Sequence, residues 1–441
     1  MEKIKKYCLL GIGGIGMSSI AQYLMIKKFK VFGFDRFSTS ITKMLENKGA
    51  KISFAESINN IPSSFNSSEV EIIYSAAINN NHPILSYFIS NGYKITKRAS
   101  FLADLVNNTE SYAIAGTHGK TTTSAILTHI FKNNKFSFSS FVGGIMVSEN
   151  TNFLNQGFEK SIVEADEFDR SFLKLNPFSA CITSMDSDHL DIYKTNNSLK
   201  DAFLKFSKNV KGPLIIHDSL SIPGIKYGLS VKADYMIENF KLTSNGYIVD
   251  LSTPKKSFKN VFCKVFGSHN LENMLAAFAI ADLAGCDSTK SIESLGSFQG
   301  IERRMRFYNF NNIIIVDDYA HHPTEIKAVY NSLREKYPGS FIEVVFQPHL
   351  YSRTKDFMDD FAIELSKFNR VKLMDIYPAR ETEIPGINSK KLLSKINCEN
   401  YILNKENFNS NIENSNADII AVLGAGNIGE LIERFIKLKN L

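Results

Sequence analysis

The sequence predicts an α/β protein in which short apolar strands alternate with helices. Apolar β-type runs bounded by glycine or polar residues recur along the chain, and stretches with helical periodicity lie between them. Two of these strands lead through a glycine-rich loop directly into a helix, at residues 11–16 and 116–119. Because alternating strands and helices form largely parallel sheets, we expect binding sites at the carboxyl ends of the strands.

Length and composition set the class of protein. A chain of 441 residues is long enough for two or three domains, and 44% hydrophobic and 22% charged residues are typical of a soluble globular protein. The net charge of +6 is mild, and no block of like charges demands nucleic acid. No apolar run reaches the ~18 residues of a membrane span, and no signal-type segment opens the sequence. We therefore expect a cytoplasmic protein with no nucleic acid and no membrane insertion. We also expect a monomer or weak dimer.

The first predicted motif is a βαβ unit. A strand over 4–10 leads into a glycine loop, a helix follows to about residue 28, and a second strand covers 30–34. The loop contains Gly11, Gly13 and Gly16 in the G-x-G-x-x-G order of dinucleotide-binding folds, with Gly14 at a variable position, and Asp35 lies near the ~20-residue distance of a ribose ligand. The same pattern recurs at 424–429, where only a short helix can follow. That copy predicts a tight strand–helix turn and shows that the pattern alone is a weak signal for NAD.

Two segments predict domain boundaries. The polar residues 106–110 end the first region, and a glycine-flanked segment at 296–301 ends the second. We therefore expect domains at 1–106, 107–298 and 299–441. Predicted strands of the middle domain cover 161–164, 180–185 and 214–217, with a β-rich stretch over 221–264 and a helix over 270–283. Those of the last domain cover 313–316, 342–346, 371–375 and 419–423.

The strongest single motif is a phosphate-binding loop at residues 116–121. An apolar strand over 112–115 stops at Gly116, and a helix follows Gly119-Lys120-Thr121. Glycine lets backbone N–H groups point at an anion, and the helix N-terminus adds partial positive charge. Lys120 can bridge terminal phosphates, and the Thr121 hydroxyl can hold Mg²⁺. The loop is shorter than the common pattern, and the alternative is an ordinary glycine turn that caps a helix.

Two clusters after strands suggest metal ligands. Residues 164–169 carry four carboxylates, beginning with Glu164, and a hard divalent cation needs such oxygens. The alternative is a solvated acidic turn. Residues 184–191 place His189 among carboxylates, although Mg²⁺ prefers oxygen to imidazole.

Further polar clusters suggest nucleotide and substrate contacts. Asn270 and Asn273 share a helix face and could bind an adenine edge, whereas helix capping would explain only Asn270. Arg304 belongs to a run of three arginines at 303–306 that could clamp phosphates or form a solvated basic turn. The segments 316–323 and 347–353 follow two other strands and could frame a small polar substrate.

Together these clusters resemble the Mur ligases, the ATP-dependent amide-forming enzymes of peptidoglycan synthesis. The resemblance runs nearly end to end and rests on Gly-Ile-Gly-Gly-Ile-Gly-Met, Ala-Gly-Thr-His-Gly-Lys-Thr-Thr-Thr, Asp-Asp-Tyr-Ala-His-His-Pro-Thr-Glu and Gln-Pro-His-Leu-Tyr-Ser-Arg-Thr. It implies three domains: a Rossmann-like domain for a UDP sugar, a P-loop ATPase-type domain with a mixed sheet, and a dinucleotide-fold-like domain that closes over the site and helps to hold the amino acid.

The resemblance also implies roles for individual residues. Catalytic roles fall to Lys120, His189, Arg304 and Asp318. The ATP site would contain Gly116, Thr117, His118, Gly119, Lys120, Thr121, Thr122, Asn270, Asn273 and Arg304. Thr121 and Glu164 would hold one Mg²⁺ and His189 a second, while Gly11, Gly13, Gly14, Gly16 and Asp35 would bind the UDP sugar. The amino acid would meet Tyr319, His321 and Arg353. Many relatives have Arg where this chain has Leu350, which leaves Arg353 as the expected carboxylate partner.

The implied reaction is the ATP-dependent joining of L-alanine to the carboxylate of UDP-N-acetylmuramate through an acyl phosphate, with release of ADP and phosphate. It would serve cytoplasmic cell-wall precursor synthesis, and hence cell shape and division. Within the family, the alternative is a recycling ligase that adds a tripeptide to the same sugar nucleotide. Outside it, an NAD-linked dehydrogenase would leave the phosphate loop unexplained, and a non-catalytic nucleotide-binding regulator would leave the acidic, histidine and arginine clusters unexplained.

Overall fold

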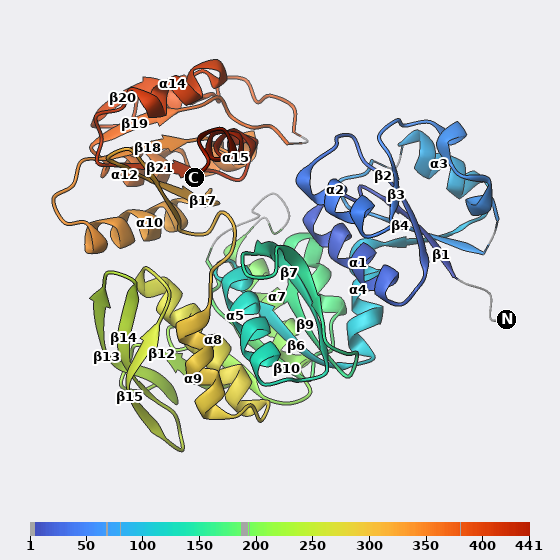
Figure 1. The fold of residues 1–441 in the computed structure, drawn as a ribbon, viewed down its shortest axis with the longest axis horizontal. Coiled ribbons are helices and arrows are strands. Elements are labelled where there is room, and N and C mark those ends of the chain that lie inside the picture. The colour runs from blue at the N-terminus through green and yellow to red at the C-terminus, as the bar shows by residue number, and fades with distance from the viewer. Residues whose placement is uncertain (1–4, 68, 80, 187–192, 194, 380) are drawn as a thin grey trace. The chain divides into compact units, whose positions relative to one another are not determined.

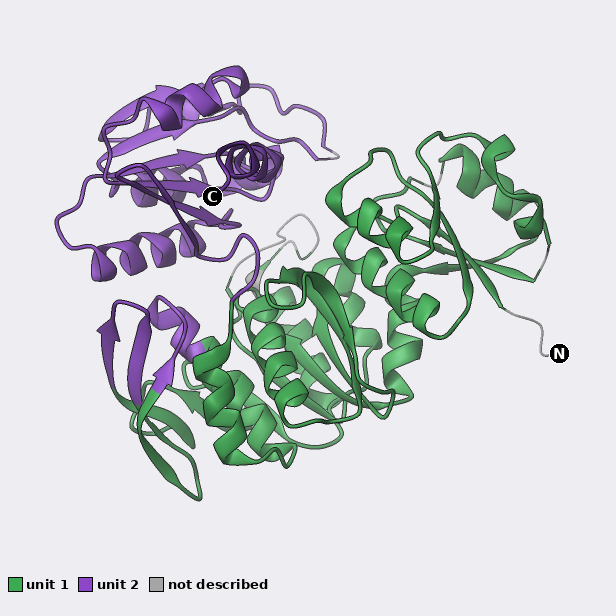
Figure 2. Ribbon diagram, viewed as in Figure 1, with its two compact units in different colours: residues 1–239, 250–261, 273–299 green, residues 240–249, 262–272, 300–441 purple. Residues whose placement is uncertain are grey.

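The computed structural model describes the chain except residues 1–4, 68, 80, 187–192, 194 and 380. The chain is α/β throughout and contains three sheets (Figure 1). It divides into two compact units, of which the first comprises residues 1–239, 250–261 and 273–299 and the second 240–249, 262–272 and 300–441 (Figure 2). The predicted fold class is confirmed.

The first sheet is fully parallel, with the order β3-β2-β1-β4-β5. Its strands are β1 (Lys6–Leu10), β2 (Lys30–Phe34), β3 (Lys51–Ser53), β4 (Val70–Tyr74) and β5 (Lys94–Lys97), and its helices are α1 (Ile15–Ile26), α2 (Ser40–Asn47), α3 (Pro83–Ser90) and α4 (Arg98–Asn107). Successive residues of β1 are buried, because helices cover both faces of a parallel sheet. The glycine loop therefore opens at the carboxyl end of β1.

The second sheet is mixed and has the order β15-β14-β13-β12-β11-β10-β6-β9-β7-β8. Its strands are β6 (Glu110–Ala115), β7 (Phe138–Met146), β8 (Thr151–Asn155), β9 (Lys160–Ala165), β10 (Ser179–Ile182), β11 (Leu214–His217), β12 (Ile225–Gly228), β13 (Tyr235–Thr243), β14 (Gly246–Ser252) and β15 (Ser257–Cys263). Its helices are α5 (Lys120–Asn133), α7 (Asn196–Lys208), α8 (Ser268–Leu283) and α9 (Ser288–Ser297), with the 3₁₀ segment η3 (Phe168–Lys174). The strand β6 runs parallel to both β9 and β10, so their ends surround the phosphate loop.

A buried polar network joins the first sheet's α1 to β8 of the second sheet. Gln22, which is 1% exposed, donates to Asn152 Oδ1 at 2.9 Å and accepts from Thr151 Oγ1 at 2.8 Å and from Lys48. Asn152 in turn donates to Ile15 O in the first turn of α1. The side chains of Gln22, Thr151 and Asn152 thus satisfy one another in this network, as buried polar groups require.

The third sheet has the order β16-β17-β21-β18-β19-β20, and only the edge strand β16 is antiparallel among its described pairs. Its strands are β16 (Arg306–Phe310), β17 (Ile313–Asp318), β18 (Ile342–Phe346), β19 (Arg370–Leu373), β20 (Glu399–Ile402) and β21 (Ile419–Leu423). Its helices are α10 (Pro323–Lys336), α11 (Tyr351–Asp356), α12 (Met358–Leu365), α13 (Ser389–Leu393), α14 (Phe408–Glu413) and α15 (Ile428–Lys439). Within the described residues, no helix is both long enough and apolar enough to cross a bilayer.

Candidate active site

The phosphate loop joins the buried strand β6 to α5. Gly116 and Gly119 have φ angles of +131° and +83°, which favour glycine. A Cβ at Gly119 would lie 2.2 Å from Asn273 Oδ1, and one at Gly116 would lie 2.1 Å from Thr183 Oγ1. Both the backbone angles and the close neighbours therefore require glycine at these two positions.

Side chains at the end of β10 support the loop. Thr117 Oγ1 and Ser184 Oγ are 2.9 Å apart, and Ser184 Oγ also accepts from the backbone N–H of His118 at 2.9 Å. Thr183 Oγ1 donates to Ala115 O at 3.1 Å. Sequence reasoning missed Thr183 and Ser184 as loop supports. The sequence did show polar residues directly after β10, but it did not show that β10 pairs with β6 and so brings them to the loop.

Lys120 is held by a buried carboxylate. Its Nζ lies 2.8 Å and 3.0 Å from the two oxygens of Glu167 and donates to Gly116 O at 2.6 Å. Glu167 is 1% exposed. Burial opposes the charge of Lys120, but the neighbouring carboxylates, chiefly that of Glu167, hold its pKa above the ordinary value. Burial raises the pKa of Glu167, and Lys120 limits that rise. Glu167 belongs to the predicted acidic cluster, but its specific pairing was not predicted.

Two predicted metal ligands meet beside the loop. Thr121 Oγ1 donates to Glu164 Oε2 at 3.1 Å, and Glu164 Oε1 accepts from Gly143 N. Glu164 reaches this position because β9 pairs with β6, opposite Ile114. His189 lies outside the described residues. The residues that are described contain no group of three or more His, Cys, Asp or Glu side chains that could hold a metal ion by themselves.

The two asparagines of α8 have different surroundings. Asn273 Oδ1 lies 3.5 Å from Thr123 Oγ1, close to the phosphate loop. Asn270 Nδ2 donates to Phe266 O at 2.9 Å, one turn back along the chain. Asn273 belongs to the first compact unit, and Asn270 belongs to the second.

Asp35 supports the first glycine loop directly. Its Oδ2 accepts from Gly13 N at 2.7 Å, and its Oδ1 accepts from Arg36 N at 2.8 Å. A Cβ at Gly13 would lie 2.9 Å from Asp35 Oδ2, so glycine allows this approach. The expected role of Asp35 as a ribose ligand stays a prediction, and the structure adds a structural role.

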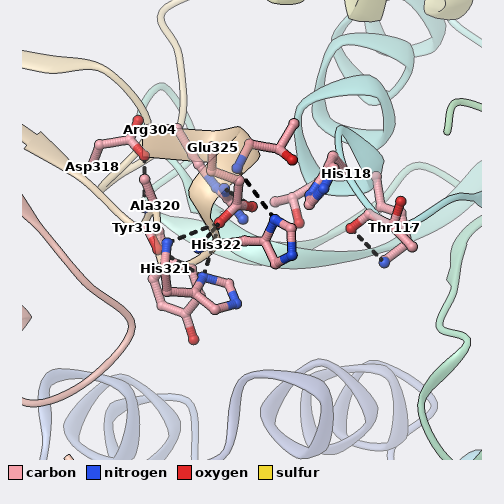
Figure 3. Close-up of polar contacts among 12 residues, drawn as sticks. Thr117, His118, Arg304, Asp318, Tyr319, Ala320, His321, His322 and Glu325 are labelled. Atoms are coloured by element: carbon pink, nitrogen blue, oxygen red, sulfur yellow. Dashed lines mark hydrogen bonds and ion pairs between the residues drawn. The ribbon is translucent and has the colours of Figure 1, made fainter. Parts of the chain in front are cut away.

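Arg304, Asp318 and Tyr319 lie together in the second unit (Figure 3). The Arg304 guanidinium is centred 5.2 Å from the Tyr319 ring, and Asp318 accepts from Met305 N and Ala320 N at 2.8 Å each. Burial raises the pKa of Asp318, although Arg304 opposes the shift. Glu325, which was not predicted as a site residue, lies 3.9 Å from Arg304 and 3.1 Å from His321 Nδ1.

Tyr319, His321 and Arg353, the residues predicted to bind the amino acid, are connected through His349, which was not named among them. The rings of Tyr319 and His321 have centroids 5.3 Å apart, and those of His321 and His349 are 6.0 Å apart. His349 Nδ1 lies 3.4 Å from Arg353 Nη1. Arg353, on α11, is 6% exposed. The ends of β17 and β18 thus bring all three predicted residues together.

Leu350 is the N-cap residue that precedes α11, and its backbone conformation is unusual, with φ 71° and ψ 136°. Its N–H donates to Tyr377 O at 2.9 Å, and its carbonyl accepts from Thr354 N at 3.1 Å. Such angles are strained for a residue with a Cβ and persist where surrounding contacts fix them. The two backbone hydrogen bonds hold Leu350 in this conformation.

Comparisons with known proteins agree with this arrangement. Residues 6–110, 114–281 and 303–426 match models described as "Mur ligase family, catalytic domain", "Mur ligase middle domain" and "Mur ligase, glutamate ligase domain". A UDP-N-acetylmuramate–L-alanine ligase of Flavobacterium johnsoniae is 42% identical over 444 residues, which cover 100% of this chain and 99% of that protein. A ligase of the same name from Christiangramia forsetii is 40% identical, with 99% and 98% covered.

Solved structures show the same fold. The UDP-N-acetylmuramate–alanine ligase of Thermotoga maritima has a TM-score of 0.85 at 26% identity and covers 99% of both chains. A murein peptide ligase of Psychrobacter arcticus has a TM-score of 0.73 at 20% identity, also over 99% of both chains, and shows the fold alone. The chain belongs to the Mur ligase family.

Proposed function

We propose that the chain is an ATP-dependent ligase that joins L-alanine to the carboxylate of UDP-N-acetylmuramate, with release of ADP and phosphate, in cytoplasmic peptidoglycan precursor synthesis. The observation that carries the proposal is the 42% identity, over the whole chain, to a ligase of that name. The contacts of Lys120 with Glu167 and of Thr121 with Glu164 supply the groups that such a reaction needs.

The chemistry begins with a poor electrophile, the muramoyl carboxylate. Transfer of the terminal phosphoryl group of ATP gives an acyl phosphate, which the amine of L-alanine can attack. Lys120 neutralises charge on the transferring group, and Glu167 fixes the direction of the ammonium before the nucleotide arrives. Backbone N–H groups at the start of α5 bind the phosphates. The strand–loop–helix therefore supplies both the Lys120 cation and the backbone donors for the phosphate oxygens.

Thr121 and Glu164 fit a magnesium ion. Both offer oxygen, their side chains are already 3.1 Å apart, and Mg²⁺ is usually bound by one or two protein oxygens together with phosphates and water. When bound there, Mg²⁺ would polarise phosphoryl oxygens and neutralise developing charge. His189 is proposed to serve a second ion.

The remaining site residues are assigned on the same basis. Gly116, Thr117, His118, Gly119 and Thr122 would hold ATP phosphates, Asn270 and Asn273 the adenine, and Arg304 and Asp318 the nucleotide from the third domain. Gly11, Gly13, Gly14, Gly16 and Asp35 would hold the UDP sugar. Tyr319, His321 and Arg353 would receive L-alanine, because a planar guanidinium suits a carboxylate. The domain limits at 1–106, 107–298 and 299–441 belong to the same proposal.

The test is an ADP-release assay of the full-length protein with ATP, Mg²⁺ and UDP-N-acetylmuramate, with L-alanine, glycine, L-serine or the tripeptide of the recycling reaction as acceptor. We expect L-alanine to give ADP, phosphate and the alanyl sugar nucleotide. AMP and pyrophosphate, or no product, would overturn the proposal. Turnover with the tripeptide alone would favour the recycling ligase.

A further inference from the structure

The loop that follows β19 lies against the start of α11. Residues 374–388 connect β19 to α13, and the part of this segment that the structure describes forms no helix and no strand beyond a single bridge between Tyr377 and His349. Irregular segments of this length inside a compact domain are uncommon and usually functional. The contacts of the loop indicate which residues it could serve.

Glu381, in this loop, supplies the cap that the first turn of α11 lacks. The N-cap residue Leu350 makes no side-chain cap hydrogen bond, because its side chain has no acceptor. Glu381 Oε2 accepts instead from Ser352 N at 3.0 Å, and Glu381 Oε1 accepts from Ser352 Oγ. Ser352 is the second residue of the helix, and its backbone N–H is one that a local cap would satisfy. A carboxylate from after another strand thus takes the place of the local cap.

Tyr377, in the same loop, holds the residues just before the helix. Its carbonyl accepts from Leu350 N at 2.9 Å, and its N–H donates to Pro348 O at 2.8 Å. Its ring stacks on that of His349, with centroids 5.7 Å apart and planes inclined by 17°. Tyr377 and Glu381 therefore fix both sides of the turn at Leu350, whose φ of 71° few residues with a Cβ adopt.

Arg353 follows Ser352 directly, and its direction depends on this first turn. The side chain is 6% exposed, and Nη1 lies 3.4 Å from His349 Nδ1. A guanidinium pairs with a carboxylate through two parallel hydrogen bonds in one plane. A tilt of the first turn of α11 would move that plane, and a misplacement of about 1 Å can cost on the order of 10²-fold in rate. What fixes Ser352 therefore also fixes the direction of Arg353.

We propose that Glu381 is a positioning residue for amino-acid binding: it fixes the first turn of α11 and so orients Arg353 toward the carboxylate of the incoming amino acid. The inference rests on the proposed function, in which Arg353 receives L-alanine. Glu381 acts as a hydrogen-bond acceptor for Ser352, and its negative charge is not required.

The experiment uses variants of the full-length protein that differ in what they leave to Ser352. Glu381→Ala removes both acceptors, Glu381→Gln keeps an acceptor for Ser352 N without the charge, and Ser352→Ala removes only the hydroxyl donor. Glu383→Ala is the matched control. Glu383 is an exposed carboxylate of the same loop and accepts from the side chain of Tyr351 at 3.2 Å, whereas Glu381 accepts from the helix backbone.

Steady-state kinetics measure KM and kcat for each substrate. We expect Glu381→Ala to raise the KM for L-alanine by on the order of tenfold or more, while kcat and the KM values for ATP and UDP-N-acetylmuramate stay within about threefold. Ser352→Ala should give a smaller rise. Glu381→Gln should restore most of the affinity for L-alanine, and Glu383→Ala should stay within about twofold of the wild type throughout.

Two further measurements separate positioning from a general loss of structure. Arg353→Ala should itself raise the KM for L-alanine, and adding Glu381→Ala should then change that KM by less than about twofold, because a residue that acts through another is not additive with it. The Tm of each variant is measured beside the kinetics. A merely structural role would lower Tm and kcat together, whereas we expect kcat at saturating L-alanine to remain close to the wild type.

Four outcomes would overturn the inference: an unchanged KM for L-alanine in Glu381→Ala or in Arg353→Ala, a loss in Glu381→Gln as large as in Glu381→Ala, or full additivity of Glu381→Ala with Arg353→Ala. The third would assign the effect to the negative charge. Each of them leaves the proposed function standing when the wild type ligates L-alanine. A wild type that does not ligate L-alanine contradicts the proposed function and this inference together.

Discussion

Lys120 and Glu167 form a pair whose two roles, in catalysis and in stability, can be separated. In Lys120→Ala, the carboxylate of Glu167 would remain buried without its ammonium, which costs about 3–5 kcal/mol of unfolding free energy. Loss of the cation should also lower kcat by on the order of 10³-fold or more. Adding Glu167→Gln should restore much of the stability and none of the activity. Urea denaturation and steady-state kinetics on the single and double variants test both points, and near-normal turnover of Lys120→Ala would show that the lysine is not catalytic.

Asp317 predicts a pH dependence of stability. It is 3% exposed, and burial raises its pKa to about 6 although Arg303 lies 3.3 Å away. The native state therefore binds more protons than the unfolded state between about pH 4 and pH 6. The contribution of this carboxyl to stability is full below about pH 4 and is lost as the pH rises through 6.

The matched variant is Asp317→Asn, which cannot titrate. Between pH 4.5 and 7.5 the wild type should lose about 2 kcal/mol relative to the variant, since one pKa unit corresponds to about 1.4 kcal/mol. Urea unfolding followed by circular dichroism at both pH values measures the difference. Parallel pH dependences would contradict the assignment.

Sequence analysis identified candidate site residues but not which of them contact one another. It predicted acidic residues at the end of β9, yet not that Glu167 would hold Lys120 while Glu164 meets Thr121. It predicted that the segment 347–353 frames the substrate, but it did not single out His349 within that segment. These pairings depend on contacts between residues that are far apart in the sequence, and one sequence contains no signal for which of several carboxylates lies at which distance.

At the scale of elements, the phosphate loop depends on Gly119 for two reasons, its φ of +83° and its closeness to Asn273. Gly285 provides a matched control, because its φ is +84° but a Cβ added there would have no atom within 4 Å. Both alanine variants should lose about 1 kcal/mol or more from backbone strain. Only Gly119→Ala should also raise the KM for ATP, by at least about tenfold. Equal KM values in the two variants would mean that Asn273 and the loop do not form the nucleotide site.

The two copies of G-x-G-x-x-G show why a motif alone did not decide function. After β1, the loop is bonded to Asp35 and faces Arg98. After β21, Gln347 occupies the corresponding loop: its Oε1 accepts from Ile428 N at 2.9 Å, and its Nε2 donates to Asn427 Oδ1 at 2.7 Å. The spacing of the glycines is the same, and the difference comes from a side chain that follows another strand, β18. The helices that follow the two copies, α1 and α15, have 12 residues each, so the expected difference in helix length does not separate them.

At the scale of the whole molecule, the α/β class and the family could be predicted because several motifs agree with one another, and the matches over 6–110, 114–281 and 303–426 confirm that prediction. The domain limits stay a prediction. The described chain separates into two compact units, and residues 1–106 share a unit with the residues that carry the phosphate loop. The reason is the packing of α1 on β7 and β8, which no local pattern reveals.

That packing predicts a coupling between distant residues. Gln22→Leu would remove the donor that Gln22 Nε2 gives to the buried Asn152 Oδ1, at a cost of about 1–3 kcal/mol. Asn152→Leu should cost a similar amount, and the double variant should cost less than the sum, by at least about 0.5 kcal/mol. The exposed Gln156, which follows β8, provides the control Gln156→Leu, which should change stability by less than about 0.5 kcal/mol. Urea denaturation measures all four, and strict additivity would contradict the coupling.

Gln22 and Asn152 are separated by 130 positions in the sequence, and the predicted limit at 106 lies between them. Recombination with the gene of a relative, with the crossover between these two positions, would combine α1 of one protein with the β7–β8 ribbon of another. Such hybrids are expected to pair a buried amide with an unsuitable neighbour. Crossovers before residue 22 or after residue 152 keep the pair intact. The first strand–loop–helix and the β7–β8 ribbon should therefore be inherited together.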